Sequence, residues 1–200
     1  MKKIFTLWML ALLPYCISAQ TDAKAAEVLD KALTQLAGNS GIRADFDGTE
    51  KGFLLLKGEM FYLNNGSIES WYDGQTQWSY VADTEEVNIS HPTPEELQGI
   101  NPYFILINYQ ENFESSYKGT NTHEGKQVQE IVLAPKGKAN EQITLWISKS
   151  NHPIYIKVVN NGKPVSEFHV KSVRKQEGIN DHVFRFNKSL YPNAEIIDLR

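Results

Sequence analysis

The stretch EKGFLLLKGEMFYLNNGSIESWYDGQTQWSYV, residues 50–81, decides the fold class of this chain. Apolar and aromatic residues form short runs in it, and turn residues separate the runs. Asn64-Asn65-Gly66 and Asp73-Gly74 are hairpin turns, because Asn, Asp and Gly tolerate positive φ. Strands joined by such short connections pair as antiparallel neighbours. The stretch therefore predicts consecutive antiparallel strands.

The same pattern continues along most of the chain, after one amphipathic helix. We expect that helix at 22–37, with Thr21 as its N-cap and an apolar stripe that includes Leu33 and Leu36. The expected strands are 42–47, 50–57, 59–64, 68–73, 76–81, 85–90, 113–118, 127–134, 141–148, 153–160, 164–174 and 182–187. They form one antiparallel meander within a single domain, residues 20–200.

One interruption separates the two groups of strands. Thr93 is suited to cap a helical turn that begins at Pro94. A second helix is expected from Tyr103 to about Tyr109, and it is apolar nearly all round. A surface helix has one polar face. This helix is therefore covered on several sides, or it borders something apolar that is not always present.

The first residues have the composition of a secretory signal. Lys2 and Lys3 precede a short apolar run, and Ser18-Ala19 offers a small-residue cleavage point. We expect a cleaved signal peptide at residues 1–19, which would remove Cys16, the only cysteine. Cys16 as a lipidation site is the alternative, but the bulky residue before it disfavours that interpretation. We therefore expect the chain to leave the cytoplasm.

Charge and motifs exclude several classes of function. The formal charge is −4 and no basic stripe is present, so we expect no nucleic-acid partner. The five histidines lack metal-ligand spacing, and no nucleophile or phosphate-loop motif occurs. We expect no metal, no cofactor, no catalysis and a monomer. The longest later apolar run, residues 103–107, is too short to span a membrane.

The pattern of some strands is typical of a curved sheet that encloses an apolar interior. Residues 53–56 and 60–63 are apolar on both faces, whereas other strands alternate. Large apolar side chains line one wall of curved sheets with covered interiors. Periodicity does not distinguish a packed core from a lined cavity, so both remain open.

The order of several motifs resembles one family. They are Leu56-Lys57-Gly58-Glu59-Met60-Phe61, Asp73-Gly74-Gln75-Thr76-Gln77-Trp78-Ser79-Tyr80, Asn101-Pro102-Tyr103-Phe104-Ile105-Leu106-Ile107, Ile131-Val132-Leu133-Ala134-Pro135-Lys136 and Phe184-Arg185-Phe186. In this order the chain resembles the periplasmic outer-membrane lipoprotein carriers of the LolA family. The resemblance covers nearly all of the chain after the signal.

The resemblance implies a mainly β fold with an α lid: a strongly curved, incomplete antiparallel half-barrel covered by short helices. It implies a carrier that takes a lipoprotein from an inner-membrane ABC transporter and shields its acyl chains. The carrier then delivers it to a receptor at the outer membrane. The location that the resemblance implies is the periplasm, reached across the inner membrane. Family members often have an arginine that tethers the lid where this chain has Lys57, which lacks the planar fork of arginine.

Alternation counted from Lys57 predicts which side chains of residues 53–63 face the cavity, and further wall and lid residues are expected beside them. The expected cavity and lid residues are Leu33, Leu36, Phe53, Leu55, Lys57, Phe61, Leu63, Trp71, Trp78, Tyr80, Phe104, Ile105, Trp146 and Ile156. The same features fit a carrier of another lipid or hydrophobic metabolite. An enzyme acting on lipid or glycan and a purely structural envelope protein are also compatible with the sequence.

Overall fold

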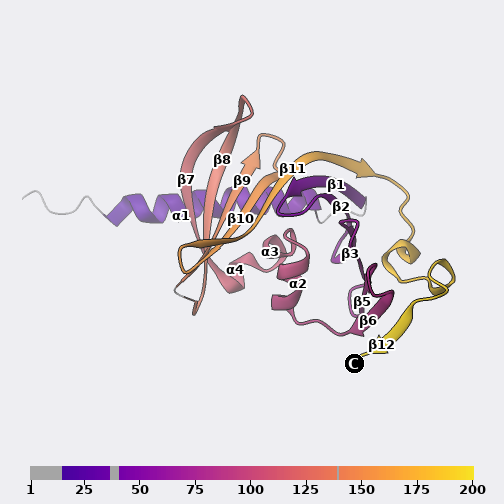
Figure 1. The fold of residues 1–200 in the computed structure, drawn as a ribbon. Helices are drawn as coiled ribbons and strands as arrows, with labels where there is room; N and C mark the ends of the chain where they lie inside the picture. The colour runs from indigo at the N-terminus through magenta and orange to yellow at the C-terminus, as the bar shows by residue number, and fades with distance from the viewer. Residues whose placement is uncertain (1–14, 37–40, 139) are drawn as a thin grey trace, which may run out of the picture.

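The computed structural model describes residues 15–36, 41–138 and 140–200, and shows one long curved sheet (Figure 1). The order of its twelve strands is β12-β6-β5-β4-β3-β2-β1-β11-β10-β9-β8-β7. The strands are β1 Gly41–Gly48, β2 Gly52–Lys57, β3 Met60–Asn64, β4 Ile68–Tyr72, β5 Gln77–Val81, β6 Glu86–Ser90, β7 Phe113–His123, β8 Lys126–Pro135, β9 Glu141–Ser148, β10 Pro153–Asn160, β11 Lys163–Gln176 and β12 Glu195–Asp198. The two ends of the sheet, β12 and β7, do not pair with each other, so the half-barrel is unclosed.

Short hairpins fix the register of most neighbours. Lys57 pairs with Met60 across a turn in which Gly58 has a φ of +60°, a conformation that glycine adopts without strain. β1 pairs with β11 and joins the two groups of strands, which are far apart in sequence. All these pairs are antiparallel, whereas β12 runs parallel to β6.

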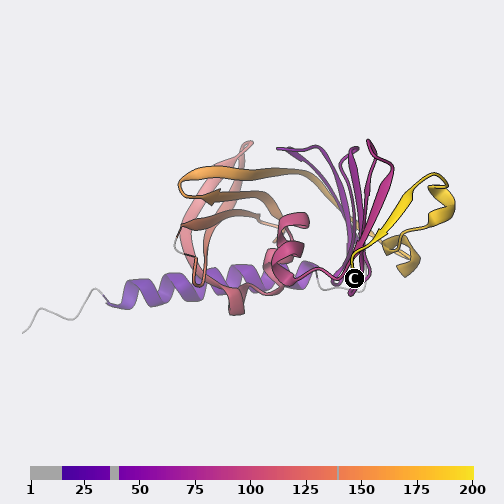
Figure 2. The same cartoon turned by 60° about the horizontal axis from the view of Figure 1, so that its bottom comes forward.

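Helices cover one side of the sheet. The helix α1 spans Tyr15–Leu36, and α2 (Pro94–Ile100), α3 (Phe104–Ile107) and α4 (Tyr109–Asn112) follow one another between β6 and β7. We call α2, α3 and α4 the lid. Thr93 and Glu96 form a reciprocal capping box at the start of α2. Figure 2 shows the sheet as an arch, with α2 and α3 beneath it and α1 along its open side.

The face of the sheet toward the helices carries the main core, and we call it the concave face. Its buried residues form one cluster with those of α1 and the lid. The concave-face members are Ile42, Ala44, Phe46, Leu54, Leu56, Phe61, Leu63, Tyr72, Phe113, Ile131, Leu133, Ile143, Leu145, Ile147 and Ile156.

The C-terminal residues cover part of the opposite, convex face. After β11 the chain forms two short 3-10 helices, η1 (Asp181–Phe184) and η2 (Lys188–Leu190), and then β12. Phe186 and Tyr191 pack against Trp71, with ring centroids 5.5 and 5.7 Å apart. This segment lies outside the arch, beside β6 (Figure 2). A second, smaller core therefore lies on the convex side.

The structure confirms the expected fold class and corrects three local predictions. The first helix begins at Tyr15 rather than Asp22, because no proline or glycine interrupts the sequence after Pro14. Its expected end at residue 37 and the first fourteen residues of the signal lie outside the described residues. Residues 182–187 are not a strand, since the Asn180 side chain accepts a hydrogen bond from the His182 amide and starts η1.

The third correction concerns the expected all-antiparallel meander, because the unpredicted strand β12 pairs in parallel with β6. Its four residues pair with β6, more than a hundred residues earlier, so no local turn announces it. Among the described residues no helix is both long and apolar enough to cross a membrane.

Candidate ligand-binding site

The concave wall is apolar over two regions of the sheet. Leu54 and Leu56 pair with Leu63 and Phe61 across β2 and β3. On the other side of β11, Leu145 of β9 pairs with both Ile131 of β8 and Ile156 of β10. Because directly opposite residues share a face, each region presents a continuous apolar surface to the helices.

The wall becomes polar toward β5 and β6. Ser70 pairs with Ser79, and their hydroxyl oxygens lie 3.3 Å apart. Gln77, opposite Tyr72, is also buried. The concave face thus has an apolar part beneath the lid and a polar part near one end of the sheet.

The lid places large apolar side chains against the apolar wall. Phe104, Ile105 and Leu106 are at most 4% exposed and belong to the same cluster as the wall. Leu97 of α2 is buried there as well. In this structure the lid side chains therefore fill space against the concave wall.

Polar contacts hold the rim of the lid. The Tyr103 hydroxyl donates to the carbonyl oxygen of Pro153 at 3.1 Å, which ties the lid to β10. The Tyr109 hydroxyl donates to the Asp30 carboxylate at 2.5 Å, which ties it to α1. Glu95 pairs with Lys138. Opening the lid would break these contacts as well as the apolar packing.

Burial has a clear electrostatic effect at the two tyrosines. It raises the pKa of the Tyr103 phenol far above its usual range, because the ionised form would be desolvated. Burial and the neighbouring Asp30 together raise the pKa of Tyr109 to about 12. Both phenols stay neutral donors at physiological pH, so these anchors do not titrate there.

Only some of the predicted site residues lie together. Leu36, Phe61, Leu63, Phe104, Ile105 and Ile156 belong to the cluster between the concave wall and the helices. Leu33 of α1 is partly buried. Whether these residues bind a ligand stays a prediction.

The expectation that all the predicted strand residues share one face is wrong. By register, Phe53 and Leu55 face the same way as Asn64 and Tyr62, and not as Phe61. The convex face holds Phe53, Leu55, Lys57, Trp71, Trp78, Tyr80 and Trp146. The reason is the two-residue turn after Lys57, which pairs odd-numbered residues of β2 with even-numbered ones of β3.

Lys57 has a different neighbour from the one expected. Its ammonium group donates to the carbonyl oxygen of Ile179 at 3.1 Å and pairs with the Asp181 carboxylate at 2.6 Å. Both partners belong to the C-terminal segment. Lys57 therefore tethers that segment to the convex face rather than the lid to the sheet.

Sequence reasoning missed several wall residues. Ile131 and Leu133, and Ile143, Leu145 and Ile147, alternate strictly with more exposed neighbours. That alternation is a sequence pattern that indicates these wall residues. No sequence pattern indicates the contact of Tyr103 with β10. Within the described part of the chain, no three His, Cys, Asp or Glu residues are grouped to hold a metal ion.

The fold and the candidate site together define an unclosed, mostly antiparallel half-barrel whose apolar concave face packs against short helices. A model of the family described as outer membrane lipoprotein carrier protein LolA matches residues 15–163. The match covers most of the chain, and the chain belongs to this family.

One solved structure with a TM-score above 0.5 shows the same fold. An uncharacterized conserved protein from Thermus thermophilus has a TM-score of 0.60 at 16% identity, over 88% of this chain and 99% of the other. LprF from Mycobacterium bovis (TM-score 0.46, 9% identity, 79% and 95% covered) and the Mycobacterium tuberculosis lipoprotein LppX (TM-score 0.45, 12% identity, 80% and 98% covered) are similar more distantly. No curated protein matches the sequence.

Proposed function

We propose that this protein is a carrier that holds acyl chains between the concave wall and the lid. The observation that carries the proposal is the single buried cluster shared by the wall and Phe104, Ile105 and Leu106. The family description, an outer membrane lipoprotein carrier, supports a lipoprotein as cargo. Binding and release of cargo, rather than catalysis, is the function.

The lid is suited to be displaced. Its helices α3 and α4 have four residues each, far below the length at which an isolated helix is stable. They are held by packing and by the rim contacts of Tyr103 and Tyr109. A ligand that supplies equivalent apolar contacts could therefore replace them.

Displacement also explains how a carrier could release its cargo. Each methylene removed from water contributes about 0.8 kcal/mol, so a chain of ~16 carbons gains ~13 kcal/mol. Two or three such chains would exceed the limit of roughly 20 kcal/mol for non-covalent binding. Expelling the lid side chains from the wall subtracts from this gain. Net affinity then stays low enough for transfer to a receptor.

The proposed location is the periplasm, because the N-terminal sequence resembles a cleavable secretory signal. Transfer would begin at an inner-membrane ABC transporter and end at an outer-membrane receptor, as the resemblance to the family implies. Both partners are part of the proposal.

A carrier for another lipid is the second candidate, and Lys57 favours it. The lysine stands where the resemblance implies a lid-tethering arginine, yet it binds the C-terminal segment instead. A different mode of lid control is compatible with a different amphiphilic cargo.

The test is binding by residues 20–200 of a synthetic lipopeptide that carries three acyl chains. The matched control is the same peptide without acyl chains, and a diacyl phospholipid serves as the competing cargo. A stoichiometric complex with the lipopeptide alone supports the lipoprotein carrier. A complex with the phospholipid alone supports the second candidate, and no complex with either refutes both.

A further inference from the structure

The sheet divides where β11 changes partners. β10 pairs with β11 only as far as Tyr155 opposite His169, whereas β1 pairs with the later part of β11, as far as Gln176. Beyond His169 the two strands therefore diverge and leave a fork between β10 and β11. The turn between β9 and β10 lies beside this fork.

A cavity of about 540 Å³ occupies the fork, and we call it the fork pocket. It is lined by residues 123–128 of the β7–β8 hairpin, by residues 169–173 of β11 and by five residues of the segment 148–154. Three separate parts of the chain thus contribute to its walls. Its volume is in the range of small-molecule sites.

The tip of the β7–β8 hairpin bends across the sheet and forms one wall of the pocket. A bulge between Tyr117 and Gly119 shifts the register, and Gly119 has a φ of +112°. The His123 ring then lies over Trp146 of β9, with centroids 5.0 Å apart, and stacks on His169 of β11 at 6.0 Å. The hairpin therefore reaches over two intervening strands.

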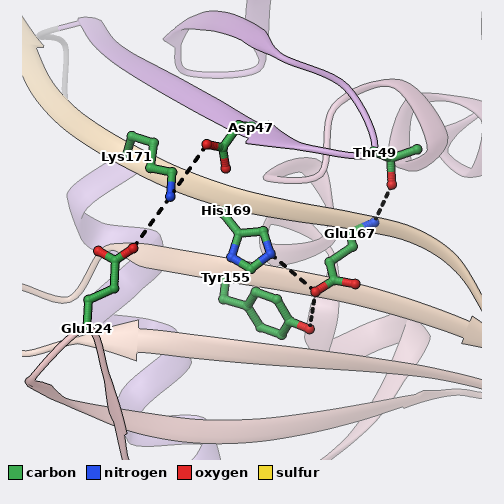
Figure 3. Close-up of polar contacts among 7 residues, drawn as sticks. All are labelled: Asp47, Thr49, Glu124, Tyr155, Glu167, His169 and Lys171. Carbon is green, nitrogen blue, oxygen red and sulfur yellow. Dashed lines mark hydrogen bonds and ion pairs between the residues drawn. The ribbon is translucent and has the colours of Figure 1, made fainter.

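Ion pairs hold the tip of the hairpin against β11. The Lys171 ammonium group lies 3.5 Å from the Glu124 carboxylate of the hairpin and 3.4 Å from the Asp47 carboxylate of β1 (Figure 3). Beside it, the Glu167 carboxylate accepts from the Tyr155 hydroxyl at 2.9 Å and contacts His169 at 3.2 Å. These contacts hold the side chains of the pocket wall in defined positions.

The pocket is basic, although the whole chain is acidic. Lys126, Lys149 and Lys171 line it together with His123, His152 and His169, and Glu124 is the one acidic lining residue. Lys126 and Lys149 form no ion pair with any described residue. With a formal charge of −4 over the chain, such a concentration of positive charge favours an anionic ligand.

A second, independent observation concerns His152. Its Nδ1 atom is buried and has no hydrogen-bond partner within the described part of the protein. Buried polar atoms are nearly always paired, so an unpaired one needs an explanation. Because Nδ1 is closed to solvent in this structure, a ligand oxygen would supply the missing partner only if the imidazole turned toward the pocket that His152 lines.

The pocket also has an apolar part. Val128, Ile154, Val170 and Val173 line it, and the last two also pack against the core of the concave face. A bare inorganic ion would not use these side chains. The combination fits an anion that carries a small organic group.

We propose that the fork pocket binds a phosphate ester, with the phosphate held by the lysines and imidazoles and the organic group against the valines. Phosphate accepts several charge-assisted hydrogen bonds at once, which matches a cavity lined by three lysines, of which Lys126 and Lys149 have no ion pair with a described residue. The ester is either a soluble metabolite or the headgroup of a phospholipid. The site is separate from the proposed acyl site, and neither proposal depends on the other.

The test uses calorimetric titration of residues 20–200 with three probes. Glycerol 3-phosphate represents the soluble source, a short-chain phosphatidylglycerol below its micelle concentration represents the headgroup, and glycerol is the uncharged control. Saturable binding of glycerol 3-phosphate without binding of glycerol supports the site with a soluble ester. Binding of phosphatidylglycerol alone supports the site as a headgroup site only where the lysine variants weaken it, because the proposed acyl site also takes acyl chains. Binding of neither phosphate probe overturns the proposal.

Paired variants locate the site. Lys126→Gln combined with Lys149→Gln should weaken binding by about tenfold or more, because two charge-assisted contacts are lost. Lys51→Gln combined with Lys163→Gln makes the same change of charge at exposed positions outside the pocket and should leave affinity unchanged. Equal effects of the two pairs would contradict the assignment.

Histidine resonances give an independent readout. The ring signals of His123, His152 and His169 should shift on addition of glycerol 3-phosphate, whereas those of His91 and His182, outside the pocket, should not. Shifts confined to the two outer histidines would refute the site. Acyl-probe binding by the lysine variants should stay normal, which separates this proposal from the carrier proposal.

Discussion

Shortening the Ile105 side chain distinguishes between two roles of the lid. Its side chains either compete with cargo for the concave wall or only stabilise the fold. Ile105 is 2% exposed and packs in the cluster shared with the concave wall. Ile105→Ala removes three carbon atoms from that cluster. At about 0.8 kcal/mol per carbon, the truncated lid gives up about 2.4 kcal/mol less when cargo displaces it.

The expected result is tighter binding of acyl chains by a less stable protein. A difference of about 2.4 kcal/mol corresponds to an affinity up to about 50-fold higher. Unfolding in urea should show a loss of about 2 to 5 kcal/mol in the free energy of unfolding. Titration with a fluorescent fatty acid of ~16 carbons measures the affinity.

The matched control is Val87→Ala on the convex face. Val87 is fully buried in the smaller core, beside Ile89 and Ala194. Its truncation should also destabilise the fold, but it should leave the affinity for the fatty acid unchanged. The reasoning is refuted if Ile105→Ala leaves affinity unchanged or weakens it, or if both variants raise it equally.

Three further predictions concern the convex face. Lys57→Met should lower the free energy of unfolding by about 1 kcal/mol and speed limited proteolysis of residues 177–200, because the C-terminal segment loses its tether. An unchanged rate of proteolysis would contradict this role of Lys57. Tyr191→Phe should cost about 1.5 kcal/mol in urea unfolding, since its hydroxyl donates to the half-buried Glu69 carboxylate at 2.9 Å; a neutral result would show that the bond contributes nothing. Burial raises the pKa of Asp45, but hydrogen bonds from Ser172 and two arginines outweigh it and hold that pKa at about 2, below its ordinary 3.8. The ionised carboxylate therefore stabilises the fold above about pH 4 and ceases to do so as the pH falls toward 2. Asp45→Asn should lower the free energy of unfolding at about pH 6 and progressively less below about pH 4. A difference in the free energy of urea unfolding that is the same at every pH would refute this.

Local turn chemistry is the part of the fold that the sequence predicts well. Asn64-Asn65-Gly66 and Asp73-Gly74 connect neighbouring strands as expected, and the capping box at Thr93 starts α2. These features depend on residues a few positions apart. The pairing of β1 with β11 and of β6 with β12 depends on residues more than a hundred positions apart, and no local pattern encodes it.

The site was harder to predict than the fold, and the reason is register. Strands with apolar residues on both faces, such as 53–56, do not reveal which face is the core. A shift of one residue exchanges the two faces. Trp71 and Trp78, expected in the cavity, are directly opposite each other on β4 and β5 and pack in the convex core beside the C-terminal segment. The convex core arises because that segment returns to the sheet, which the sequence did not indicate.

Native mass spectrometry of the protein, purified gently from the periplasm of its own host, tests the central claim most directly. The account predicts a co-purifying acylated molecule, and a triacylated lipoprotein in particular. Competition with a fluorescent fatty acid should release it. A protein that is isolated empty and also ignores the added fatty acid would contradict the carrier account and indicate a packed structural core.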